Sequence, residues 1–205
     1  MNSEFYLTGY KETLQNASDL LLIANNSGEL KKYGVAVSLS ILSAEESIKA
    51  LFIIQQSIDP KAKVSDFDKI FRNHKIKHEY LHDFIRTIMK YCYDLIDEYE
   101  KYIPNRKEKR AFERKNPKIT ARMNWIKENQ KFSDDMYQLI GWLEDANSKK
   151  NKGLYVDIER NNWELPRNTS ENKYLKSIGN AKDILEYVKF ATDILSEIHF
   201  KSPIK

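Results

Sequence analysis

The sequence predicts an all-α protein, an antiparallel helix bundle of one domain that spans residues 1–205. Apolar side chains recur at spacings of three and four residues along several long stretches, as they do in helices with one buried face. The chain has only 6 Gly and 5 Pro, so turn signals are too few for a fold of many short strands. Hydrophobic residues make up 41% and charged residues 31%, which is the composition of a globular protein.

Two helices are expected before Pro60. The first covers about residues 7–25, and the Asn-Ser-Gly sequence of residues 26–28 should end it. The second covers about residues 29–57 and is apolar on most of its sides, which predicts a central place in the bundle. Pro60 stops this helix, because the residue before a proline is disfavoured in the helical conformation.

A third helix is expected to begin near Ser65, which suits the N-cap position, and to end at about Tyr102, before Pro104. A basic loop is expected over about residues 105–122, where Pro117 interrupts the chain.

Two extra helices complete the C-terminal part of the bundle. They cover about residues 120–146 and 170–200, and each carries an apolar stripe. A short irregular or extended segment is expected between them, near residues 153–166.

Charge is unevenly distributed along the chain. The net charge is +4, whereas residues 105–122 hold eight basic and two acidic residues, a local charge of +6. The rest of the chain is therefore slightly acidic, with a net charge of −2. A basic segment in such a protein predicts a polyanionic partner or, alternatively, a solvated surface loop.

The sequence predicts a cytoplasmic protein that does not contact a membrane. Its first residues have neither the basic nor the apolar stretch of an export signal. No apolar run approaches the roughly 20 residues that a membrane span needs. Cys92 is the only cysteine, which excludes an internal disulfide and suits a reducing compartment.

Two histidines stand where the third helix should face the core. From Phe71 onward the apolar positions follow a heptad, and His74 and His78 occupy two of them. A buried imidazole needs hydrogen-bond partners, since an unsatisfied buried polar group costs about 1–3 kcal/mol. Such a histidine can be structural, but two of them flanked by Arg72 and Lys77 favour a functional site.

The same histidines allow a metal interpretation. His74, His78 and His82 are spaced by four residues, which places them on one side of a helix. No carboxylate or cysteine completes a metal signature, so we expect neither a metal nor another cofactor. The sequence also lacks a Gly-rich phosphate loop, a serine nucleophile elbow and a Cys-x-x-Cys motif.

Acidic residues in the second helix form the other candidate cluster. Glu45 and Lys49 are four residues apart, which suits a surface ion pair. Alternatively, Glu45 or Glu46 is partly buried on this largely apolar helix and needs a cationic partner. Arg72 or a protonated His78 would serve, and the carboxylate would then orient the histidine.

Several segments resemble the AbiV branch of the HEPN superfamily, a family of bacterial abortive-infection proteins. Residues 43–50 (SAEESIKA) resemble its Ala-(Ile)-Glu-Glu-(Leu)-Gly-Lys-Ala stretch, with Ser47 where the family usually has Gly. Residues 71–77 (FRNHKIK) look like its Phe-x-x-His-x-x-Lys, and residues 152–157 (KGLYVD) resemble its Gly-Leu-Tyr-Val-Asp. The Arg and His of residues 72–78 also fit the spacing of the whole superfamily.

The resemblance implies an all-α homodimer whose motifs face each other across the two-fold axis, with metal-independent endoribonuclease activity. Such proteins act against phage: infection, through a trigger such as a phage-encoded protein, leads them to halt the host, and the RNA target can be tRNA, mRNA or rRNA. The catalytic candidates are Arg72, Asn73, His74, which fits the branch motif, and His78, which fits the superfamily spacing. The residues expected to support them are Glu45, Glu46, Lys49, Lys77, Tyr155 and Asp157. The residues expected to bind RNA are Arg106, Lys107, Lys109, Arg110, Arg114 and Lys115.

The expected chemistry needs no metal, because the 2′-OH of RNA can attack the adjacent phosphate. Histidine, with a reference pKa of about 6.5, suits general acid–base catalysis, and the fork of donors on Arg72 matches phosphate oxygens. Arg72 and His78 are six residues apart, about 120° around one helix, so two facing chains would align them better than one.

A non-catalytic function is the alternative. Many HEPN proteins have lost catalysis, and a helical interaction protein would bind a phage or host protein, or RNA, without cleaving it. RNA cleavage by the purified protein in EDTA distinguishes the two.

Overall fold

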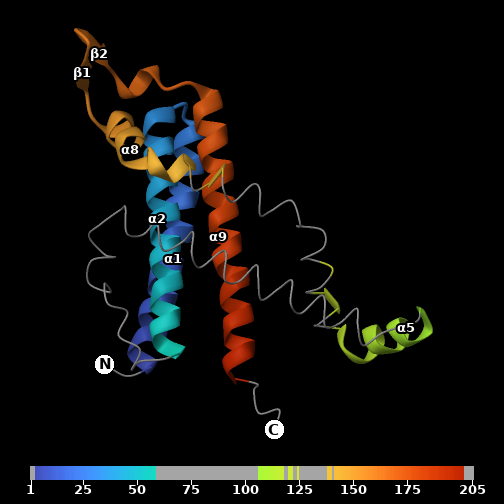
Figure 1. The fold of residues 1–205 in the computed structure, drawn as a ribbon. Helices are drawn as coiled ribbons and strands as arrows, with labels where there is room; N and C mark the ends of the chain where they lie inside the picture. The colour runs from blue at the N-terminus through green and yellow to red at the C-terminus, as the bar shows by residue number, and fades with distance from the viewer. Residues whose placement is uncertain are drawn as a thin grey trace. The chain divides into compact units, whose positions relative to one another are not determined.

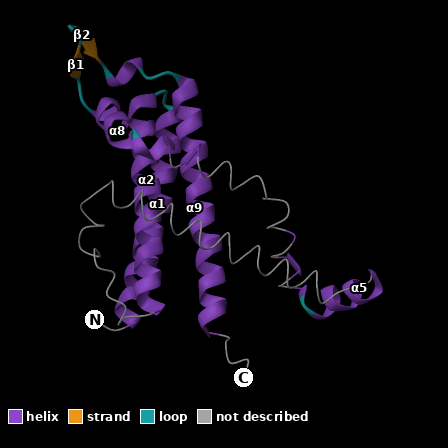
Figure 2. Ribbon diagram, in the orientation of Figure 1, coloured by secondary structure: helices purple, strands orange, loops and turns teal. Residues whose placement is uncertain are grey.

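The computed structural model describes residues 3–58, 106–117, 120–121, 124, 138–139 and 141–200. The chain divides into two compact units, residues 1–79 with 141–205, and residues 80–140. Most described residues are helical, and the strands among them belong to one small hairpin (Figures 1 and 2). The predicted all-α class is confirmed, whereas the single domain stays a prediction. None of the described helices combines the length and apolar character that crossing a membrane requires.

The first unit is built around α2 (Tyr33–Ile58). This helix packs against α1 (Ser3–Glu29), α8 (Ala146–Leu154), η1 (Pro166–Asn168) and α9 (Glu171–Phe200). Its buried residues fall on nearly every side, because the sequence supplies small or apolar side chains at most positions. The predicted central place of this helix is therefore confirmed.

α1 runs antiparallel to both α2 and α9 (Figure 1). At one end of the unit, Tyr33 in the first turn of α2 stacks on Tyr174 in the first turn of α9, with ring centroids 5.6 Å apart. Toward the other end, the side chains of Tyr10 in α1 and Thr192 in α9 are hydrogen-bonded, and burial raises the pKa of Tyr10. α2 and α9 therefore begin at the same end and run in the same direction.

The turn after α1 corrects the predicted end of the first helix. Lys31 adopts the left-handed conformation, with φ of 57°. The N–H groups of Lys31 and Lys32 donate to the carbonyl oxygens of Gly28 and Ser27, both at 2.8 Å, which is a Schellman motif. Gly28 lies inside the helix instead of ending it, and a side chain at this position would overlap the ring of Tyr174.

α8 approaches α2 through residues with little or no side chain. A Cβ at Gly153 of α8 would overlap Ser38 Oγ and the carbonyl oxygen of Gly34, both in α2. Ser38 Oγ donates a hydrogen bond of 2.8 Å to the carbonyl oxygen of Lys150. A Cβ at Gly34 would lie only 2.6 Å from the carbonyl oxygen of Pro166. The two glycines therefore allow α8 and η1 to lie directly on α2.

A hairpin follows α8, with β1 (Asp157–Glu159) antiparallel to β2 (Asn162–Glu164). Arg160 and Asn161 join the strands with φ of 49° and 66°, as a two-residue turn of type I′ requires. The extended segment predicted near residues 153–166 is confirmed for the strands, but its first two residues belong to α8.

The remaining predicted helices are described in part. The helix predicted from Ser65 to Tyr102 lies outside the described residues, as does most of the one over residues 120–146. At the end of the latter, residues 141–144 are helical, and a turn at Asp145 separates them from α8. The predicted start of α9 is confirmed, since Ser170 Oγ accepts a hydrogen bond from an N–H of the first turn at 3.4 Å.

The loop predicted over residues 105–122 is wrong for α5 (Arg106–Lys115), which is a helix in the second unit. Lys, Arg, Glu and Ala, which fill nine of its ten positions, all favour helix. Glu108 in its first turn and Arg114 in its last complement the helix dipole. The charge of this segment therefore accompanies a regular helix.

We expect Gly153→Ala to lower the free energy of unfolding by about 1–3 kcal/mol, because the added methyl group has no space against α2. Gly179→Ala in α9 is the control, since no atom of the described residues lies within 4 Å of a Cβ at that position. This control should stabilise the protein by about 1 kcal/mol, as alanine does in a helix interior. Denaturant unfolding of both variants measures the difference, and equal stabilities would contradict the close contact.

Candidate functional site

The four catalytic candidates, Arg72, Asn73, His74 and His78, lie outside the described residues, together with Lys77. The other candidates belong to three parts of the described chain: α2, the segment around the hairpin, and α5. They are Glu45, Glu46 and Lys49 on α2, Tyr155 and Asp157 next to or in β1, and the six basic residues of α5.

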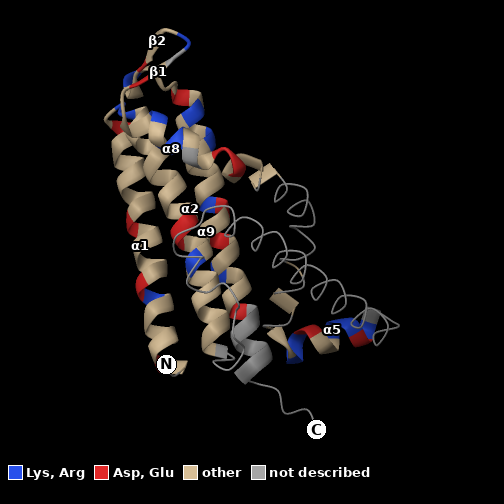
Figure 3. Ribbon diagram, turned by 60° about the vertical axis from the view of Figure 1, so that its left-hand side comes forward, with Lys and Arg blue, Asp and Glu red and all other residues tan. Residues whose placement is uncertain are grey.

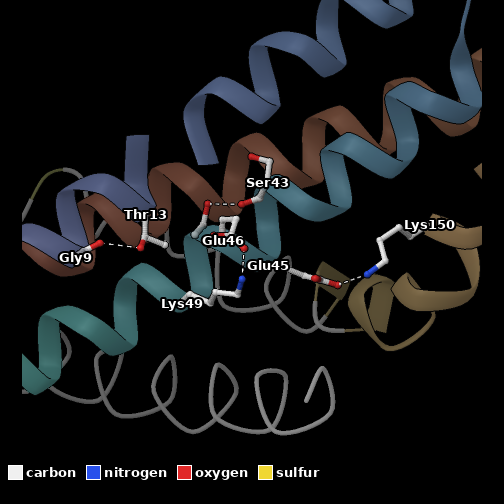
Figure 4. A network of polar contacts seen from close by, with 8 residues as sticks. Gly9, Thr13, Ser43, Glu45, Glu46, Lys49 and Lys150 are labelled. Carbon is white, nitrogen blue, oxygen red and sulfur yellow. Dashed lines mark hydrogen bonds and ion pairs between the residues drawn. The ribbon is translucent and has the colours of Figure 1, made fainter. Parts of the chain in front are cut away.

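Glu45 is a buried carboxylate, with only 3% of its surface exposed. Its Oε1 lies 3.5 Å from Nζ of Lys150 in α8, whose side chain is 13% exposed (Figure 4). A carboxylate at such a depth needs a cation, because burial without one would remove its hydration uncompensated. The expectation of a buried carboxylate with a cationic partner is confirmed, and the described partner is a lysine that the sequence did not single out.

Glu46 and Lys49 form a separate, partly exposed ion pair on the same helix. The predicted ion pair between Glu45 and Lys49 is therefore wrong. The physical reason is visible in Figure 4, where Glu46 points to Lys49 while Glu45 extends toward α8. Consecutive residues of a helix point about 100° apart, so the two carboxylates reach different partners.

Two buried serines lie on the side of α2 opposite Glu45. Ser43 Oγ donates a hydrogen bond of 2.7 Å to the carbonyl oxygen of Ala17 in α1. Ser47, which replaces the usual glycine of the family, donates to the carbonyl oxygen of Ser43 at 2.9 Å. Both hydroxyl groups are buried and satisfied, so Ser47 fits this interior without an unpaired polar atom.

The helices that carry two of the segments resembling AbiV proteins pack against each other. Residues 43–50 lie in the middle of α2, and residues 152–157 begin in the last turn of α8. The pair of Glu45 and Lys150 joins these elements, which are far apart in sequence. The run of lysines before Gly153 is the sequence signal that could have indicated a partner for the buried carboxylate.

Tyr155 and Asp157 occupy a different environment, at the surface. Tyr155 follows α8 and is 64% exposed. Asp157 is exposed at the start of β1, and its Oδ1 accepts a hydrogen bond of 2.8 Å from the N–H of Ile158. Among the described residues, no three His, Cys, Asp or Glu side chains are grouped as metal ligands would be.

The basic candidates all lie on α5, where Lys and Arg are interleaved with Glu108 and Glu113 (Figure 3). The side chains of Lys107, Lys109, Arg110, Arg114 and Lys115 are exposed. Which of these charges lie on the same face of α5 follows from their spacing along the helix. The predicted role of these residues in RNA binding remains a prediction.

We expect a double-mutant cycle of Glu45→Gln and Lys150→Met to give a coupling of about 1–2 kcal/mol in the free energy of unfolding. Lys150→Met alone should cost about 2 kcal/mol, because it removes a charged partner from a buried carboxylate. The exposed pair of Lys182 and Glu186, at 3.9 Å in α9, is the control, with an expected coupling of about 0.3–0.5 kcal/mol. Additive effects at Glu45 and Lys150 would show that the two charges do not interact.

The family model described as AbiV, of the HEPN group, matches residues 5–186. No curated protein and no solved structure matches the chain. The matched residues run from α1 into α9 and include the segments 43–50, 71–77 and 152–157. Because the match covers most of the chain, the protein belongs to the AbiV family of HEPN proteins.

Proposed function

We propose that this abortive-infection family member protects bacteria against phage as a metal-independent endoribonuclease. The observation that carries the proposal is the family match over residues 5–186, which includes Arg72, Asn73, His74 and His78. The proposed trigger is a phage-encoded protein, and the proposed outcome is arrest of host translation or growth. The proposed substrate is cellular RNA.

The proposed reaction is attack by a 2′-OH on the neighbouring phosphorus. A histidine, His74 or His78, takes the proton of the 2′-OH, and the 5′ oxygen that leaves acquires a proton. The phosphate ends as a 2′,3′-cyclic diester. Because the attacking 2′-OH belongs to the RNA itself, the proposed reaction needs no metal and no other cofactor. Arg72 stabilises the charge on the crowded phosphate through its fork of donors, and Asn73 and Lys77 position the strand.

The proposed supporting role of Glu45 draws on its burial and its pairing. The ion pair with Lys150 of α8 holds the buried carboxylate of Glu45 in one orientation. A residue that orients a catalytic group needs such a fixed orientation. Glu46, Lys49, Tyr155 and Asp157 are proposed as supporting residues on the strength of the family segments in which they lie.

The test uses the variants Arg72→Ala, His74→Ala and His78→Ala. Phage protection, RNA cleavage in EDTA and thermal stability are measured for each variant. Loss of the catalytic histidine should lower the rate of cleavage by about 100-fold or more and abolish protection, with stability retained. A structural histidine would instead cost about 1–3 kcal/mol of stability, because its buried partner loses a hydrogen bond.

His82→Ala is the matched control, since His82 follows His78 by four residues in the sequence and lies outside both motifs. It should leave cleavage and protection unchanged. Folded variants of Arg72 and of both histidines that still protect cells would rule out the ribonuclease proposal.

We further propose that the protein acts as a homodimer, in which two copies of the Arg72–His78 segment assemble one site. Light scattering should give twice the mass of the 24.2 kDa chain, and dilution should lower it only at concentrations near the dissociation constant. A monomer mass across the whole concentration range, together with RNA cleavage, would contradict a site shared between chains.

A non-catalytic interaction protein is the second candidate, and the hairpin favours it. Ile158 and Trp163 face each other across the strands and are 59% and 65% exposed. Exposed apolar side chains of this size are typical of protein contacts. Absence of RNA cleavage in EDTA by the folded dimer, combined with intact phage protection, would support this function instead.

A further inference from the structure

One face of α5 carries three exposed cationic side chains. Lys107, Arg110 and Arg114 are spaced by three and four residues, which places them within about 60° around the helix axis. All three side chains are exposed. Lys109 and Lys115 are equally exposed, but helical geometry places them more than about 100° from the centre of this face.

The acidic residues of α5 itself point away from this face. Glu108 and Glu113 lie about 90° or more from its centre. The three cations span about 10 Å along the axis, given a rise of 1.5 Å per residue. A nucleic-acid strand of a duplex places one phosphate about every 3.4 Å of axis, so the face meets several phosphates at once. Arg110 and Arg114 add forks of donors that match phosphate oxygens.

The rest of the helix argues against a membrane surface as the partner. A helix that lies on a membrane needs a broad apolar side opposite its cations. The apolar residues of α5 are Ala111 and Phe112, which point about 100° apart and form no such side. The charge pattern alone therefore favours a flexible polyanion that approaches from one direction.

We propose that Lys107, Arg110 and Arg114 form a binding face for the phosphate backbone of RNA, without preference for sequence. The proposal rests on the proposed function in so far as RNA is the substrate, and it names three of the six basic residues of α5 as those that contact it. Lys109 and Lys115 contribute only to net charge.

The test compares Arg110→Gln/Arg114→Gln with Lys109→Gln/Lys115→Gln in the full chain. Each double variant removes two charges, and glutamine preserves helix propensity, so α5 itself stays intact. The ligand is a single-stranded 2′-O-methyl oligoribonucleotide, which keeps every phosphate but cannot be cleaved through its 2′ oxygen. Binding is therefore measured whether or not the protein is a ribonuclease.

The slope of the logarithm of the RNA-binding constant against the logarithm of the salt concentration should fall in magnitude by about 1.4 in the variant Arg110→Gln/Arg114→Gln, because each lost phosphate contact removes about 0.7. The slope should stay unchanged in Lys109→Gln/Lys115→Gln. Arg110→Lys/Arg114→Lys, which keeps both charges, should retain the slope of the original protein. In cleavage of ordinary RNA, the arginine pair should raise KM and leave kcat unchanged, because α5 binds the strand and does not act on the reacting atoms.

Equal losses of slope in the two glutamine variants would overturn the proposal, because they would mean that only net charge matters. An unchanged slope in Arg110→Gln/Arg114→Gln would overturn the proposal as well. So would a variant of this arginine pair that binds RNA as before but binds vesicles of equimolar phosphatidylserine and phosphatidylcholine more weakly. Failure of the ribonuclease proposal appears differently, as absence of cleavage while the oligonucleotide still binds through the arginine pair.

Discussion

The close contact of Gly153 with α2 places Lys150 beside the buried carboxylate of Glu45. Because neither Gly153 nor Gly34 carries a side chain, α8 rests on the backbone of α2. Lys150, one helical turn before Gly153, then has its carbonyl oxygen at Ser38 and its ammonium group at Glu45. A bulkier residue at this contact would move α8 outward and leave the carboxylate of Glu45 without this partner.

Stability alone does not account for the pair of Glu45 and Lys150. Removing two charges from water costs several kcal/mol, and their attraction only offsets that cost, so an apolar pair of similar volume would stabilise the fold at least as well. What the pair provides is a fixed orientation for a carboxylate on the side of α2 that faces α8, whereas Ser43 and Ser47 lie on the opposite side of the helix and bond to α1 and to α2 itself.

The parts of this structure that were predictable from sequence depend on local pattern. The apolar character of α2 indicated its central place, and the apolar stripe over residues 170–200 indicated α9. The pairing of Glu45 with Lys150 was not predictable, because the two residues are 105 positions apart and the nearer lysine, Lys49, offered a local alternative. The helix α5 was missed because its charge suggested a solvated loop, although nine of its ten residues favour helix. The residues around His74 and His78 lie outside the described part of the chain, so their predicted roles rest on the sequence and the family.

Burial separates two kinds of residue within the segment 152–157. Gly153 is required by packing, since any side chain there would overlap α2, and this accounts for a glycine at that position without reference to chemistry. Tyr155, two residues later, is 64% exposed and follows the end of α8, so burial does not account for a large aromatic side chain there. The same holds for Trp163 on the hairpin, which is 65% exposed. An exposed aromatic ring contributes little to the stability of its own fold, because most of it stays in water. A fully buried aromatic side chain removes about 150–250 Å² of surface from water. Packing inside the protein therefore accounts for the glycine, whereas it does not account for the two rings.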